Sequence, residues 1–86
     1  MSFHIGQVVV CVQDGWEGPD VYRCRKMGCR FPVAQSVYVV RGTLQRYGDV
    51  GLYLQEIRNP AILFIDGQYE PAFSKANFRP AAKTDI

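Results

Sequence analysis

The chain has 86 residues, of which 48% are apolar and 21% charged, with ten lysines and arginines against eight aspartates and glutamates. A chain of this length folds as one small domain with a thin core, which excludes a two-domain enzyme. The formal net charge of +2 falls short of the strong basicity typical of a dedicated nucleic-acid-binding protein.

Short apolar segments rich in Val, Ile, Tyr and Phe, separated by Gly and Pro, predict a mostly β fold. The first predicted strand covers 6–13 and is apolar at nearly every position, which favours a strand covered on both faces. A long loop at 14–35 leads to strands at 36–46 and 50–58. These two strands are joined by a hairpin turn at 45–49, where Gly48 can adopt a positive φ.

The second half of the chain continues with shorter elements. Pro60 ends the third strand because proline has no amide donor, and an apolar run at 61–65 follows. A short strand at 69–73, a single 3-10 turn capped by Ser74 and a last edge strand at 79–81 complete the prediction, with a flexible tail at 82–86.

Five short strands with a central hairpin and one helical turn before the last strand predict a small, partly open SH3-like barrel. It is expected to form a single domain over residues 1–81. The side chains expected to face the interior are those of Val9, Cys11, Tyr38, Val40, Leu44, Leu52, Leu54, Ile57, Phe73 and Phe78.

Four sequence segments carry a resemblance to a known family. They are Val-Val-Cys-Val-Gln-Asp near the start, Ser-Val-Tyr-Val-Val-Arg-Gly, Gly-Leu-Tyr-Leu-Gln-Glu-Ile followed by Asn-Pro, and Phe-Arg-Pro before Lys-Thr-Asp-Ile. These segments resemble small uncharacterised proteins of proteobacteria and their phages or prophages. The resemblance runs from residue 9 to 86 but skips 15–30. It implies an SH3-like barrel and transfers no catalytic residue.

The loop at 14–35 carries separated charges, since Asp14, Glu17 and Asp20 precede Arg23, Arg25, Lys26 and Arg30. In one interpretation the acidic and basic limbs pair with each other and leave no binding surface. In the other, the long loop on a rigid scaffold binds a partner.

Two functions from different classes follow from the second interpretation. The first is a non-catalytic interaction module, whose surface for a protein partner or a second copy contains Trp16, Tyr22, Tyr53 and Tyr69. The alternative is a nucleic-acid-binding module, in which the four basic residues of the loop contact phosphates while Tyr22 or Phe31 stacks on bases.

The cysteines allow a third, weaker hypothesis. Cys24 and Cys29 could bind zinc with Cys11 and His4 as distant partners, could form a disulfide, or could remain plain thiols. Basic neighbours could also make one of these thiols reactive. Because His4 is the only histidine, no general base can be placed beside a thiol, so neither an enzyme activity nor a cofactor is predicted.

The cysteine count and the N-terminus indicate the compartment. An odd number of cysteines and an N-terminus without a basic region predict a cytoplasmic protein. The longest apolar run, at 8–12, is far too short to cross a bilayer, so no membrane partner is expected.

Overall fold

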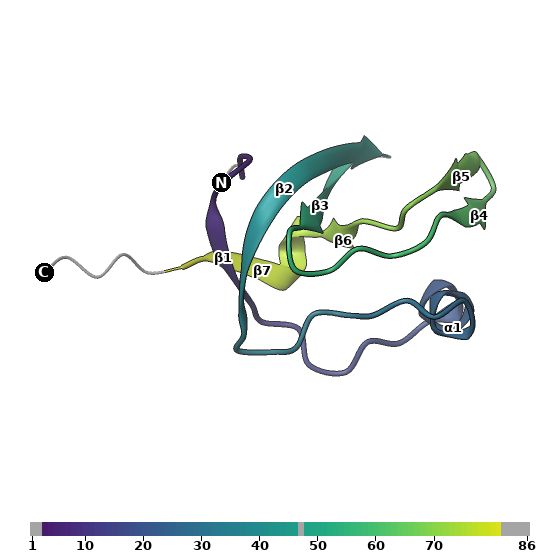
Figure 1. The fold of residues 1–86 in the computed structure, drawn as a ribbon, viewed down its shortest axis with the longest axis horizontal. Helices are drawn as coiled ribbons and strands as arrows, with labels where there is room; N and C mark the ends of the chain where they lie inside the picture. The colour runs from purple at the N-terminus through teal and green to yellow at the C-terminus, as the bar shows by residue number, and fades with distance from the viewer. Residues whose placement is uncertain (1–2, 47, 82–86) are drawn as a thin grey trace, which may run out of the picture.

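The computed structural model describes residues 3–46 and 48–81. Its main element is an antiparallel five-stranded sheet in the order β6-β3-β2-β1-β7 (Figure 1). Its strands are β1 (Val8–Cys11), β2 (Val37–Arg46), β3 (Asp49–Leu54), β6 (Phe73–Ser74) and β7 (Phe78–Pro80). Because β6 and β7 stand at opposite ends of this order, the sheet is not closed.

Three shorter elements complete the described chain. They are the helix α1 (Pro19–Lys26), a separate hairpin of β4 (Ile62–Phe64) with β5 (Gly67–Tyr69), and the 3-10 turn η1 (Lys75–Asn77). Among the described residues, no helix has the length and apolar character that crossing a membrane requires.

The predicted central hairpin is confirmed. Strands β2 and β3 pair from Val40 opposite Leu54 to Arg46 opposite Asp49, with a register shift between Val40 and Gly42. Such a bulge strengthens the local twist, and β2 is visibly curved in Figure 1. Tyr47 of the predicted turn and the predicted tail at 82–86 lie outside the described residues.

The main core agrees with the predicted interior at nine of ten positions. It consists of Val9, Cys11, Tyr38, Val40, Leu52, Leu54, Ile57, Phe73 and Phe78. The exception, Leu44, is only half-buried. The prediction that both faces of the first strand are covered is wrong, because Val8 is 43% exposed on the face opposite Val9. A chain this short has too few residues to cover a second face of its sheet.

The segment at 14–35 is not a plain loop, because it contains α1. Pro19 stands at the start of the helix, where its fixed φ suits the first turn and its missing amide hydrogen costs nothing. Gly28 adopts a φ of +88°, and the amides of Gly28 and Cys29 donate to the carbonyls of Arg25 (3.0 Å) and Cys24 (2.9 Å). This Schellman motif ends the helix after eight residues, too few for a periodic apolar pattern.

The prediction of a single strand at 69–73 is wrong, because β5 ends at Tyr69 and β6 begins only at Phe73. Pro71 cannot donate to a ladder, and Glu70 faces Arg41 instead of a strand partner. The 3-10 turn before the last strand is confirmed, and the Ser74 hydroxyl accepts a hydrogen bond from the Ala76 amide (3.3 Å).

Candidate functional site

Two segments leave the sheet and extend away from β1 and β7, toward the right of Figure 1. We call residues 12–36, which contain α1, the first arm, and residues 55–72, which contain β4 and β5, the second arm. Because each arm connects two strands of the five-stranded sheet, the sheet holds the bases of both arms in place.

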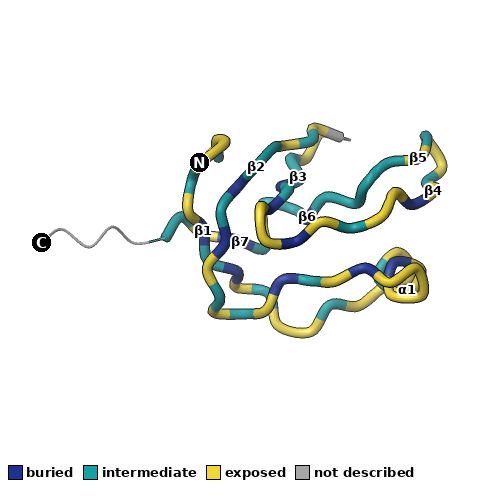
Figure 2. Tube along the Cα trace, in the orientation of Figure 1, coloured by how far each residue is buried: buried dark blue, intermediate teal, exposed yellow. Residues whose placement is uncertain are grey.

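A second, small core joins the arms. Cys24 and Cys29 from the first arm and Ile62 from the second are buried together, and Phe31 and Phe64 pack against them. This core lies away from the main core and explains why α1 has a buried side in a mostly exposed helix (Figure 2).

Polar contacts strengthen the same junction. The Asn59 side chain accepts a hydrogen bond from the Arg30 amide (2.8 Å) and donates to the Arg30 carbonyl (2.9 Å). The Arg23 guanidinium donates to the Leu63 carbonyl. Because these bonds cross from one arm to the other, they hold the two arms at a defined separation.

The second arm is also tied to the sheet by Arg41 of β2. Its guanidinium donates to the Leu54 carbonyl (2.8 Å) and forms an ion pair with Glu70 (2.5 Å). The same carboxylate accepts a hydrogen bond from the Asn59 amide (3.0 Å). Both members of the ion pair are largely buried, so this network anchors both ends of the second arm.

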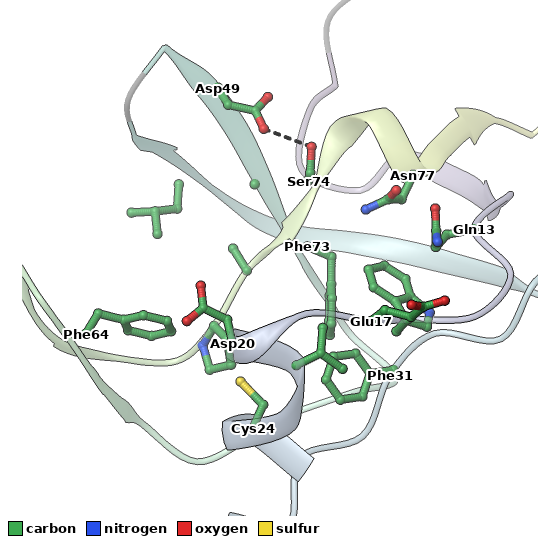
Figure 3. Close-up of a pocket in the computed structure, with 16 residues that line it drawn as sticks. Gln13, Glu17, Asp20, Cys24, Phe31, Asp49, Phe64, Phe73, Ser74 and Asn77 are labelled. Carbon is green, nitrogen blue, oxygen red and sulfur yellow. Dashed lines mark hydrogen bonds between the residues drawn. The ribbon is translucent and has the colours of Figure 1, made fainter.

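A groove of about 610 Å³ lies between the arms and the adjacent part of the sheet (Figure 3). Its wall is built on three aromatic rings, Trp16, Phe31 and Phe73, whose centroids are 5.5 to 5.9 Å apart. The Trp16 indole N–H donates to the Pro32 carbonyl (2.9 Å), which fixes the orientation of that ring. The remaining apolar lining comes from Val21, Cys24, Leu44, Phe64, Pro71 and Ala72.

Among the described residues that line the groove, every charged side chain is a carboxylate: Glu17, Asp20 and Asp49. In Figure 3 the carboxylates of Glu17 and Asp20 lie on either side of Phe73. The hydrogen bond from the Ser74 hydroxyl (2.8 Å), and then that from the Val50 amide, lower the pKa of Asp49. Asp49 therefore stays ionised at neutral pH, and the groove carries negative charge beside apolar rings.

The structure separates the residues that the sequence placed in one binding surface. Trp16 lines the groove, whereas Tyr22 is 62% exposed on α1 and lies outside the groove lining. Tyr53 and Tyr69 are half-buried and do not line the groove. The Tyr53 hydroxyl donates to the Glu70 carbonyl (2.8 Å), and the Tyr69 ring stacks on Phe64 with centroids 4.6 Å apart.

The four basic residues of the first arm lie outside the groove lining. Among the described residues, the acidic and basic limbs form one ion pair, Asp20 with Arg23 at 3.6 Å. Arg25 lies over the Phe31 ring (5.2 Å), and Lys26 lies over the Tyr22 ring (5.1 Å). Arg30 is exposed. Pairing between the limbs therefore neutralises one of the four basic side chains.

The three cysteines are free thiols, and Cys24 and Cys29 are both buried. Their contact is the apolar contact that accompanies a Schellman motif. Burial raises the pKa of Cys24, and burial followed by the neighbouring Cys24 raises the pKa of Cys29 to about 11. Within the described ranges, no group of three or more His, Cys, Asp or Glu side chains is placed to hold a metal ion.

Sequence reasoning identified Trp16 but missed the groove in which it lies. The lining residues come from positions between 13 and 77, and Phe73 was expected only as a core residue. The one local signal was a pair of carboxylates, Glu17 just before α1 and Asp20 in its first turn, both of which line the groove.

Comparisons with known proteins identify no relative. No family model matches the chain, and neither a curated protein nor a solved structure matches it. The interpretation of the groove therefore depends on its own shape, lining and charge.

Proposed function

We propose that this protein is a non-catalytic interaction module that binds an extended segment of a partner protein in the groove between its arms. The observation that carries the proposal is the lining: a wall of aromatic rings beside carboxylates, with no cation among the lining residues that the structure describes. A segment with one apolar residue and one Lys or Arg would complement both parts. Aromatic side chains held rigidly in place are typical anchors of such interfaces.

The surroundings of the titratable groups support a non-catalytic role. A nucleophilic thiol needs a lowered pKa, whereas the pKa values of Cys24 and Cys29 are raised. The only histidine, His4, is exposed and lies outside the groove lining. The free thiols are compatible with a reducing, cytoplasmic compartment.

We further infer that the five-stranded sheet is a partly open SH3-like barrel, related to the small bacterial and phage proteins that the sequence resembles. The supporting observations are the position of β1 between β2 and β7 and the 3-10 turn directly before β7. In that architecture the long connection between the first two strands helps to frame a peptide groove. The first arm occupies this connection.

The fluorescence of Trp16, the only tryptophan, reports directly on the groove. We would titrate the protein with ten-residue peptides that share the same apolar residues and carry Lys, Gln or Glu at one position. The Lys peptide should bind about fivefold more tightly than the Gln peptide, because an exposed charge pair is worth up to about 1 kcal/mol. The Glu peptide should bind least.

Paired variants identify the carboxylates involved. Glu17→Gln should remove most of the preference for Lys, whereas Asp14→Asn, at an exposed acidic residue outside the groove lining, should preserve it. If no peptide changes the Trp16 emission, or if the Glu peptide binds as well as the Lys peptide, the proposed function is wrong.

Nucleic-acid binding by the first arm has less support. Phe31, one of the two rings expected to stack on bases, is half-buried between Trp16 and Phe73, with Arg25 over its face. Tyr22 remains as an exposed ring, and Lys26 lies over it. Single-stranded nucleic-acid binding usually combines cations with several accessible rings.

A further inference from the structure

The end of the molecule formed by α1 and the β4-β5 hairpin carries an unusual set of exposed side chains. We call it the distal surface, because it lies at the end of the two arms farthest from β1 and β7 (Figure 1). Its apolar members are Ile65 (97% exposed), Leu63 (66%), Tyr22 (62%) and Met27 (58%). Its charged members are Arg23, Arg25, Lys26 and Arg30, all exposed.

Four members of the distal surface, Arg23, Lys26, Met27 and Leu63, are neighbours. A shallow depression of about 320 Å³ between α1 and the hairpin is lined by Arg23, Lys26, Met27, Ala61, Ile62, Leu63 and Gln68. Both charged residues in this lining are cations. Arg23 donates to the Leu63 carbonyl, which holds the helix and the hairpin in one rigid surface.

Acidic residues near the distal surface are engaged by local partners. Asp20 pairs with Arg23 (3.6 Å), and Asp66 accepts a hydrogen bond from the Tyr69 hydroxyl (2.9 Å). Asp20 also faces the groove, on the other side of the helix from Tyr22. Even with Asp20 and Asp66 counted, the four basic side chains leave the distal surface with a net positive charge, beside aliphatic side chains that are open to solvent.

These properties fit one occupant best. An anionic lipid surface accepts aliphatic side chains at the headgroup boundary and attracts Lys and Arg to its phosphates. A nucleic acid would use the cations but would leave Ile65, Leu63 and Met27 in water. We propose that the distal surface docks this protein reversibly onto an anionic membrane. The protein would lie on the bilayer without crossing it.

The proposal differs from the sequence-based expectation of no membrane partner. That expectation depended on the length of contiguous apolar runs, whereas the distal surface combines side chains from positions 22 to 30 with others at 63 and 65. A surface of this kind has no signature in a contiguous window of sequence.

Flotation with lipid vesicles tests the proposal on the full chain. Vesicles of phosphatidylcholine and phosphatidylglycerol in equal parts should bind the protein, whereas vesicles of phosphatidylcholine alone should not. High salt should release it, since the attraction of exposed charges is screened. Arg25→Gln and Lys26→Gln should each lower the partition coefficient about fivefold, and Ile65→Ser about tenfold.

Matched controls lie on the sheet. Val37→Ser, at a residue 56% exposed on β2, and Arg79→Gln, at an exposed residue of β7, should leave vesicle binding unchanged. All these positions are exposed, so the circular dichroism and the unfolding midpoint of each variant should match those of the parent chain.

Four outcomes would overturn the proposal. The first three are no binding to anionic vesicles, equal binding to neutral vesicles, and equal losses in the sheet controls. A fourth is salt-dependent binding of an oligonucleotide that Arg25→Gln weakens and Ile65→Ser does not, without vesicle binding. That result would assign the distal surface to nucleic acid. Peptide binding in the groove is measured separately, so either proposal can fail alone.

Discussion

Gly51 of β3 packs closely against Ala72 of the second arm. A Cβ added at this glycine would lie 2.5 Å from the Ala72 Cβ, whereas carbon atoms in good contact are about 3.5–4.0 Å apart. In Gly51→Ala, the arm must therefore move by about 1 Å or the strand must shift. We expect a loss of about 1–3 kcal/mol in the free energy of unfolding, the usual cost of overpacking.

Urea unfolding followed by circular dichroism measures this cost, and a second substitution tests its cause. Ala72→Gly alone should destabilise the protein by about 0.5–1 kcal/mol through backbone entropy. Combined with Gly51→Ala, it removes the clashing methyl group, so the double variant should recover most of the stability that Gly51→Ala loses. Gly42→Ala is the matched control, because its added Cβ would meet Tyr53 at an ordinary 3.7 Å. Its expected effect is below about 1 kcal/mol.

A Gly51→Ala variant as stable as the parent chain would show that the added methyl group meets no obstacle at Ala72. Additive losses in the double variant would show the same, since additivity means that the two methyl groups do not meet. Because Gly51 and Ala72 both line the groove, the same variants test the packing that shapes it.

Three further predictions concern single contacts. Arg41→Met should lower the free energy of unfolding, measured in urea, by about 2–3 kcal/mol, because it leaves the largely buried Glu70 carboxylate without its ion pair. Adding Glu70→Gln should recover part of that loss, because it removes the unpaired charge. Burial and then the neighbouring Cys24 raise the pKa of Cys29 from its ordinary 9.0 to about 11, so stability should be full below pH 9 and should fall between pH 9 and about 11. Thiolate absorbance that rises near pH 9 in the folded protein would contradict this prediction. Ser74→Ala should raise the pKa of Asp49. In the parent chain the lowered pKa stabilises the fold above the unfolded pKa of this carboxyl group, and that stabilisation is lost as the pH falls through the folded pKa. A titration of the Asp49 carboxyl by NMR that is unchanged in Ser74→Ala would disprove the assigned hydrogen bond.

Local sequence patterns were sufficient for the strands of the central hairpin and for the turn at Ser74. In β2 and β3, alternation assigned Val40, Leu52 and Leu54 to the interior, because side chains of a strand alternate between faces. Ser74 caps its turn by a bond to an amide two residues away, so its role needs no distant partner.

Elements that depend on distant partners were missed. Helix α1 is too short to be stable alone, and its buried Cys24 packs on Ile62, which lies 38 positions further along the chain. Likewise, Glu70 leaves the predicted strand because Arg41 attracts it from another element. Neither contact has a signature within a sequence window.

The sequence by itself determined the fold class, the interior of the sheet and the local separation of acidic from basic residues in the first arm, because these follow from neighbours along the chain. Tertiary structure decided where those charges face. It directs the side chains of Glu17 and Asp20 toward the groove, which is lined by aromatic rings, and leaves those of Arg25 and Lys26 outside it. The reason is that the small core of Cys24, Cys29 and Ile62 sets the rotation of α1 against the second arm.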